Sequence, residues 1–66
     1  MVITINGKSE EIKMQANLYE LLLSKGLCLD NLVVEYNSLI VPKQKWQEII
    51  LKENDTIEVV SFVGGG

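Results

Sequence analysis

The chain has to fold without covalent or metal cross-links. Cys28 is its single cysteine and histidine is absent, so one chain can form neither a disulfide framework, nor a metal cluster, nor a Cys/His catalytic pair. A chain of this size buries only about 60% of the surface that its unfolded form exposes. Its stability must therefore come from a small hydrophobic core, for which a hydrophobic content of 47% is sufficient. We expect one compact domain with no bound metal and no enclosed cofactor site.

The charge of the chain argues against nucleic acid as a partner. Six lysines, no arginine and nine acidic residues give a net charge of −3, which repels a phosphate backbone. An acidic surface is better suited to a basic protein. The first residues carry neither a basic segment nor a long apolar run, and no stretch approaches the ~20 apolar residues of a membrane span. With its single thiol, the sequence predicts a cytoplasmic protein that does not bind membranes.

The N-terminal residues predict a β-hairpin. A β-branched run over residues 2–5 ends at Asn6-Gly7, a dipeptide that accepts the positive φ angles of a type I′ turn. The returning strand is expected over residues 8–14, where Ile12 and Met14 are spaced to share one face.

One helix is predicted over residues 17–25. Asn17, followed three residues later by Glu20, has the pattern of a capping box. Gly26 suits the left-handed conformation that ends many helices. Between these signals, apolar residues recur at helical spacing, and we assign them to the core: Leu18, Tyr19, Leu21 and Leu22.

The second half of the chain predicts three strands. Residues 33–36 and 39–41 are expected to be strands around an Asn37-Ser38 turn, and residues 56–63 have the strongest strand pattern in the chain. The remaining segments are expected to be a loop over 27–31, a helical turn over 43–46, a brief extended piece over 48–51 and a polar turn over 52–55.

The order of these elements indicates an α+β fold. A hairpin, then a helix, then further strands leaves the first and last strands free to pair in parallel beneath a single helix. This order fits a β-grasp, with a mixed sheet of four to five strands packed on one main helix, and it also fits other α+β folds.

Three consecutive glycines follow the last predicted strand, although glycine is costly to order and contributes no packing. We divide the chain into a domain over residues 1–63 and a flexible tail over residues 64–66. One interpretation of the tail is a frayed terminus. The other is a segment without side chains, about 10 Å long when extended, that enters a narrow channel of a partner and delivers its terminal carboxylate. Because the chain lacks an internal base and a paired nucleophile, we expect no catalytic residue.

Several motifs occur together in this chain: Val41-Pro42, Trp46, an Asn54-Asp55 turn and glycines at the last positions. In this combination, and with its opening hairpin and leucine-rich helix, the sequence resembles the ThiS family of sulfur carriers over essentially its whole length. The resemblance implies a β-grasp, or ubiquitin-like, fold. The chain departs from the family in having Lys43 where arginine is frequent and Asn54 where glycine is frequent; asparagine tolerates a left-handed backbone, whereas lysine lacks the planar fork of arginine.

The resemblance also implies a reaction cycle in which the chain is a protein co-substrate and not an enzyme. A ThiF-like adenylyltransferase would use ATP to convert the Gly66 carboxylate to an acyl-adenylate. Sulfur from a donor protein would displace AMP, and the resulting thiocarboxylate would serve a ThiG-like thiazole synthase in thiamine biosynthesis. Gly65 and Gly66 align with the terminal pair of the family, and Gly64 takes a position where some relatives have other small residues. The chain itself would bind no cofactor.

Two aromatic residues are candidates for docking on these partners. Trp46 is either a docking aromatic or an anchor that holds a loop on the core. Phe62, next to the glycines, would contribute to an apolar docking patch if it points away from the helix. We expect Cys28, between two leucines, to be a small and partly buried apolar residue and not a sulfur-accepting thiol.

Two alternative functions remain open from the sequence. A carrier for molybdopterin or another sulfur-requiring pathway would share the tail chemistry and differ in its acceptor. A β-grasp interaction module or protein modifier would have a tail that is inert or that is joined to lysines.

Overall fold

A two-residue turn at Asn6-Gly7 sets the register of the first two strands. In the computed structural model, which describes residues 1–13 and 15–62, Asn6 has a φ of 50° and Gly7 a φ of 81°, as a type I′ turn requires. The turn joins β1 (Val2–Ile5) to β2 (Lys8–Glu11) in antiparallel pairing. β2 is shorter than the predicted strand over 8–14, although the Ile12 amide still donates to the Met1 carbonyl at 2.8 Å. The expectation for Met14 lies outside the described residues.

The predicted helix and both of its ends are confirmed. α1 (Leu18–Ser24) begins with a complete capping box, in which the Glu20 amide donates to Asn17 Oδ1 at 2.7 Å and the Asn17 amide donates to Glu20 Oε1 at 3.0 Å. Gly26 follows with a φ of 72°, the left-handed conformation that ends the helix.

The later strands also follow the predicted pattern, with somewhat different bounds. β3 (Leu32–Tyr36) turns at Asn37-Ser38 into the short β4 (Leu39–Ile40), and β5 (Thr56–Ser61) is the last strand. The predicted end of β5 at Val63 lies outside the described residues. The described residues also form two 3-10 helices, η1 (Leu29–Asn31), where a loop was predicted, and η2 (Lys43–Glu48), which extends the predicted helical turn.

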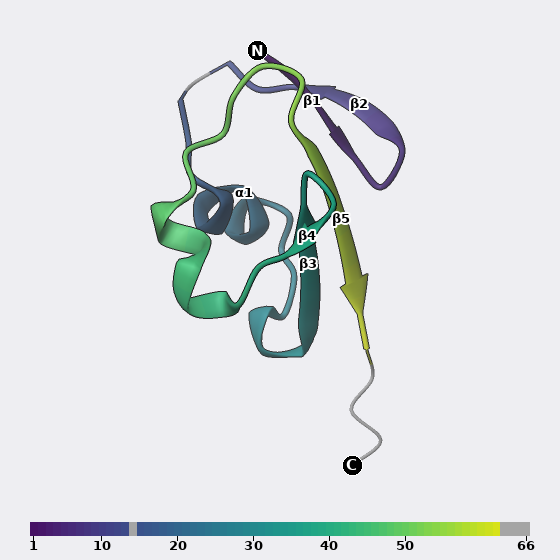
Figure 1. Cartoon of the computed structure of the whole chain (residues 1–66), viewed down its shortest axis with the longest axis vertical. Coiled ribbons are helices and arrows are strands. Elements are labelled where there is room, and N and C mark those ends of the chain that lie inside the picture. Colours follow the sequence, from purple (N-terminus) through teal and green to yellow (C-terminus); the bar gives the residue numbers. More distant parts are fainter. Residues whose placement is uncertain (14, 63–66) are drawn as a thin grey trace.

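The five strands form one mixed sheet in the order β2-β1-β5-β3-β4 (Figure 1). β5 lies at the centre, parallel to β1 and antiparallel to β3, so the predicted parallel pairing of the first and last strands is confirmed. The extended piece predicted over 48–51 is reduced to an isolated bridge between Asn17 and Ile50. Its backbone bonds the start of α1 instead of the sheet, since the Leu18 amide donates to the Ile49 carbonyl at 2.9 Å.

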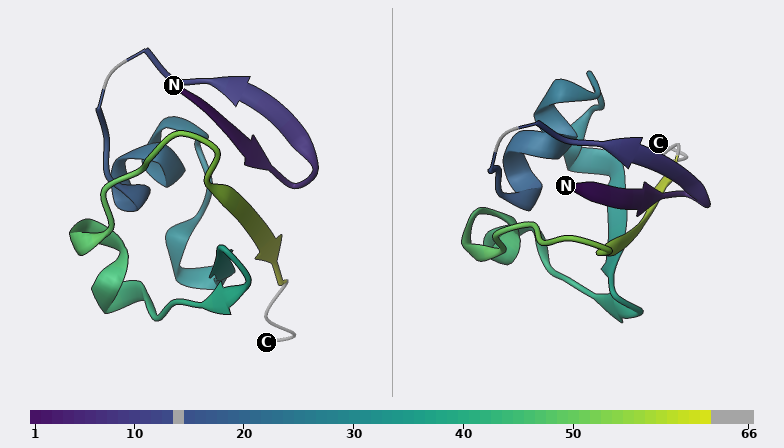
Figure 2. Two further views of the ribbon diagram at one scale, coloured as in Figure 1. Left: turned by 45° about the horizontal axis from the view of Figure 1, so that its top comes forward. Right: turned by 90° about the horizontal axis from the view of Figure 1, so that it is seen from above.

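The core lies between the sheet and a layer made by α1 and η2, which cover the same face (Figure 2). Trp46 of η2 is its largest fully buried side chain, and its indole N–H donates to the Val41 carbonyl at 3.0 Å. No described element covers the opposite face of the sheet, which we call the outer face. The buried core residues are Ile3, Leu18, Leu21, Leu22, Val34, Trp46, Leu51 and Ile57.

The turn between β3 and β4 places a serine in a conformation that favours glycine. Ser38 has a φ of 76° at the second central position of the turn. We expect Ser38→Gly to raise the free energy of unfolding by about 1 kcal/mol, because glycine adopts this backbone without strain. Urea denaturation measures the change. Ser9→Gly in the middle of β2 is the control and should lower the stability; an unchanged or lower midpoint for Ser38→Gly would contradict the strain.

Candidate functional site

The described chain ends beside the centre of the sheet. β5 pairs with β1 at its start and with β3 along its length, and beyond it the Phe62 amide donates to the Asn31 carbonyl at 2.9 Å. In the sequence, residues 63–66 follow Phe62, whose backbone this hydrogen bond holds in place. The three glycines proposed as the modified residue and its recognition segment, Gly64, Gly65 and Gly66, lie outside the described residues, as does the predicted flexibility of that tail.

An apolar patch lies on the outer face next to the end of β5. Side chains alternate along β5, so Val60 and Phe62 lie on the side opposite Ile57, which is buried in the core. Phe62 therefore meets the condition set by the sequence analysis, that it point away from the helix. The outer patch consists of four side chains with exposed fractions between 39% and 69%: Val33, Ile40, Val60 and Phe62.

Trp46 is not part of this surface. Its side chain is 1% exposed, packs in the core and has its indole N–H satisfied by the Val41 carbonyl. A docking role for Trp46 is therefore wrong, and the alternative interpretation, an anchor that holds η2 on the core, is the one that the structure bears out. The error arose because tryptophan is enriched both at interfaces and as a loop anchor, and the sequence does not distinguish the two.

Cys28 is exposed, contrary to the expectation of partial burial. It precedes η1, whose short turn places the thiol at the surface even though both neighbouring leucines pack against the core. Nearby, Lys43 Nζ donates to Asp30 Oδ1 at 2.6 Å, and this hydrogen bond lowers the pKa of Asp30. Both side chains are exposed to solvent, so the ion pair contributes little to stability.

A buried polar network surrounds Asp55, and the sequence pattern gave no sign of it. Asp55 is 3% exposed, and its carboxylate accepts hydrogen bonds from the Tyr36 hydroxyl at 2.7 Å, the Lys52 amide at 2.7 Å and the Asn37 side-chain amide at 3.2 Å. Asn37 Oδ1 in turn accepts from the Thr56 amide at 2.8 Å. The network connects the Asn37-Ser38 turn to the turn over residues 52–55 and fixes the start of β5.

The network controls the ionisation of its members. Burial acts to raise the pKa of Asp55, but the hydrogen bonds from Tyr36, Lys52 and Asn37 outweigh it and hold the pKa below its ordinary value. Burial and the hydrogen bond to Asp55 raise the pKa of Tyr36, so this hydroxyl remains a donor. The hydrogen bond to Tyr36 raises the pKa of Lys52, whose Nζ lies 3.2 Å from the hydroxyl oxygen.

The Asp55 network predicts a loss of stability in acid. Because the folded pKa of Asp55 is lowered, its contribution is complete above the unfolded value of 3.8 and is lost as the pH falls through the folded value. We expect Asp55→Asn to lower the free energy of unfolding by about 2 kcal/mol at neutral pH. Its unfolding free energy should also decline less steeply below pH 3.8 than that of the wild type. Urea denaturation over a pH series checks both; parallel curves would refute the assignment.

Neither a metal site nor a membrane span is found in the part of the chain that the structure describes. No group of three or more side chains of the metal-binding types comes together within residues 1–13 and 15–62. Among the same residues, every helix is too short or too polar to cross a bilayer.

The fold defines a class of protein. A five-stranded mixed sheet with parallel first and last strands, packed on one main helix, is a β-grasp domain. The sequence model of the ThiS family matches residues 3–66, and the chain belongs to the ThiS family.

Individual relatives agree with this assignment. The chain is 36% identical over 66 residues to the sulfur carrier protein ThiS of Bacillus subtilis, covering 98% of this chain and 100% of that protein. It is 35% identical over 66 residues to a thiazole synthase of Magnetococcus marinus, of which it spans only 20%. The crystal structure of the thiamine biosynthesis protein ThiS from Geobacter metallireducens superposes with a TM-score of 0.85 at 28% identity, and all of both chains is covered.

Proposed function

We propose that the chain is a sulfur carrier in thiamine biosynthesis and that the Gly66 carboxylate carries the sulfur as a thiocarboxylate. The observation that supports this most strongly is the extent of the family match, which runs from residue 3 to residue 66 and includes all three terminal glycines. The match to the Bacillus subtilis sulfur carrier protein ThiS, at 36% identity over 66 residues, also supports the carrier role.

The proposed chemistry belongs to the partners of the chain. A carboxylate is a poor acyl donor, so a ThiF-like adenylyltransferase must activate it: a carboxylate oxygen of Gly66 attacks the α-phosphorus of ATP and pyrophosphate leaves. The outer sulfur of a persulfide on a donor protein then attacks the acyl carbon and displaces AMP, which gives an acyl disulfide. A thiol of the donor or of the activating enzyme attacks the inner sulfur, forms a disulfide with it and releases the thiocarboxylate. Gly64 and Gly65 would let the reactive end enter a narrow channel, since neither residue has a side chain. The chain acts as a co-substrate in this cycle, with no cofactor of its own, and we propose that the cycle runs in the cytoplasm.

The folded body provides recognition in this scheme. The outer patch lies beside the end of β5, only a few residues before Gly66 in the sequence, so a partner that takes up Gly66 has to come close to it. Phe62 keeps its proposed docking role because it is exposed and adjacent to those residues. The body must bind twice, once to the activating enzyme and once to the sulfur acceptor. Nucleic acid and membranes have no role in the cycle.

Thiazole synthase is the acceptor we propose. The thiazole synthase of Magnetococcus marinus contains a segment that this chain matches over 66 residues. Linking two modules in one polypeptide raises their effective concentration for each other, which is useful when they act on one another. This arrangement supports transfer of sulfur from the carrier to thiazole synthase.

Complementation of two strains tests the proposal. In one strain the thiamine sulfur carrier is deleted, and in the other the molybdopterin sulfur carrier is deleted. We expect this chain to restore growth without thiamine in the first strain and to leave molybdenum-enzyme activity absent in the second. Rescue of the second strain alone would assign the chain to the other pathway, and lysine-linked conjugates without any rescue would indicate a protein modifier.

A further inference from the structure

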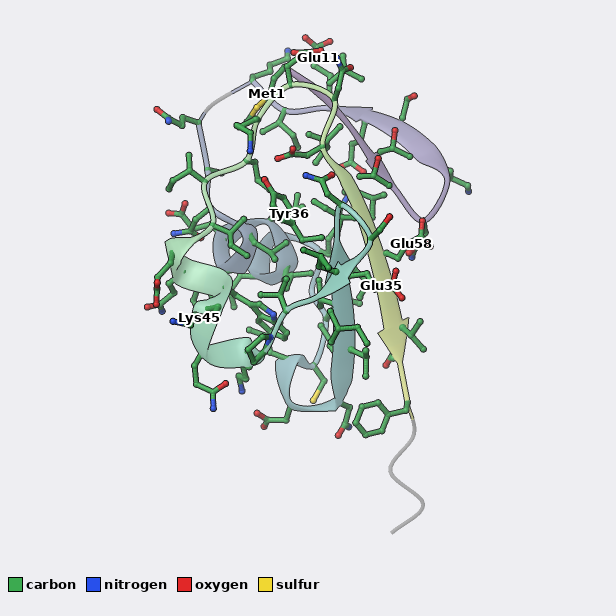
Figure 3. All side chains as sticks on the ribbon, in the orientation of Figure 1. Met1, Glu11, Glu35, Tyr36, Lys45 and Glu58 are labelled. Atoms are coloured by element: carbon green, nitrogen blue, oxygen red, sulfur yellow. The ribbon has the colours of Figure 1, made fainter. Side chains whose placement is uncertain are left out.

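Two glutamates face each other on the outer face of the sheet. Glu35 of β3 and Glu58 of β5 are direct partners in the antiparallel ladder (Figure 3). The residues next to them, Val34 and Ile57, are buried in the core, so both glutamates point to the opposite side. Directly opposite side chains in a ladder have Cβ atoms about 4.5–5.5 Å apart, and like charges in such a pair are destabilising.

Nothing in the described part of the chain neutralises this pair. The structure describes all six lysines, and none of them lies within ion-pair distance of Glu35 or Glu58. Lys25, Lys43 and Lys45 pair with other carboxylates, and Lys52 bonds the Tyr36 hydroxyl. In the free protein, water must screen the two negative charges, which is possible only while the outer face stays exposed.

The glutamate pair adjoins the outer patch. Val33 and Val60 are partners two positions along the same ladder and so lie on the same face as the glutamates, and Ile40 lies opposite Glu35 on β4. A partner that covers these apolar side chains will also remove water from the two carboxylates. Covering two like charges without a counter-charge is strongly unfavourable.

The position of the patch indicates which partner covers it. Residues 63–66 can span at most about 14 Å. An enzyme that acts on the Gly66 carboxylate must therefore lie against the end of the sheet where β5 ends, and the outer patch is at that end.

We propose that the outer patch and the Glu35–Glu58 pair together bind the adenylating partner through an arginine surrounded by apolar side chains. A guanidinium has five donors in one plane and can bridge two carboxylates, whereas the compact ammonium of lysine cannot match both so well. The inference rests on the proposed function. It assigns to Glu35 and Glu58 a recognition role that offsets their mutual repulsion in the free carrier.

Steady-state adenylation kinetics test the inference. The variants are Glu35→Gln, Glu58→Gln and the double variant, and the matched control is Glu11→Gln, an exposed glutamate of β2 that lies far from the pair in Figure 3. We expect the double variant to raise KM for the carrier by about 10- to 100-fold with kcat unchanged, because charge-assisted contacts to the partner are lost. Its KM should also depend less on salt, while the control stays within about twofold of the wild type.

The thermal midpoint and the adenylation of the wild type distinguish a recognition role of the pair from effects on folding and on the reaction itself. The thermal midpoint of the double variant should equal or exceed that of the wild type, since a repulsion has been removed. If the wild type is adenylated and the double variant keeps the wild-type KM, or if Glu11→Gln weakens binding equally, the inference is overturned and the sulfur-carrier role stands. If the wild type itself is not adenylated, the proposed function fails and this inference fails with it.

Discussion

Deleting Gly66 is expected to abolish thiocarboxylate formation while leaving the folded domain intact. The deletion still leaves a glycine carboxylate at the end of the chain, but that carboxylate falls short of its position by one residue, about 3.5 Å. Misplacement of a reacting group by as little as 1 Å can cost about 100-fold in rate, so we expect the loss to exceed about 1,000-fold. The buried core side chains of the described residues lie between Ile3 and Ile57, and a glycine has no side chain to pack.

A matched extension makes this experiment sharper. One alanine added after Gly66 displaces the terminal carboxylate by one residue beyond its normal position, whereas the deletion leaves it one residue short. The added alanine should abolish the modification equally. Intact-mass spectrometry after incubation with the activating enzyme measures the product, and circular dichroism monitors the fold. Thiocarboxylate formation in either variant at the wild-type rate would show that the position of the terminal carboxylate is not what the partner requires.

Trp46→Ala is expected to have the largest effect on stability. Trp46 is the largest fully buried side chain and joins η2 to α1 and the sheet. Removing a buried tryptophan costs about 3–5 kcal/mol through lost burial and the cavity that remains. Stabilities of whole domains are only about 5–15 kcal/mol, so a domain of 66 residues should be largely unfolded, or close to it, at physiological temperature.

Trp46→Phe is the control for this substitution. It keeps an aromatic ring in the core but removes the indole N–H that donates to the Val41 carbonyl. We expect this variant to lose about 1–3 kcal/mol, less than the alanine variant. Urea denaturation followed by far-ultraviolet circular dichroism measures both, and a cost of less than about 1 kcal/mol for Trp46→Ala would contradict the assignment of Trp46 to the core.

The parts of the fold that local chemistry specifies could be predicted from the sequence. The Asn6-Gly7 turn and the Asn17–Glu20 capping box each involve residues a few positions apart, and the structure has both as expected. The segment over 48–51 was predicted less well, because its backbone bonds the residues around Asn17 and these bonds depend on how η2 packs beneath α1. Strand patterns alone do not carry that information.

Contacts between residues that are far apart in the sequence could not be predicted. Asp55 was interpreted as part of a polar turn, which it is, but its burial depends on Tyr36 and Asn37, nearly twenty positions away. The opposition of Glu35 and Glu58 likewise appears only once the register of β3 on β5 is known.

The most direct test of the account is the intact mass of the chain after incubation with a ThiF-like adenylyltransferase, ATP and a sulfur donor. We predict that the protein becomes heavier by the difference between a sulfur and an oxygen atom, that the added mass maps to Gly66, and that omission of ATP prevents the change. An unchanged mass, with an enzyme that modifies its own carrier in the same mixture, would contradict the assignment of this chain as a sulfur carrier.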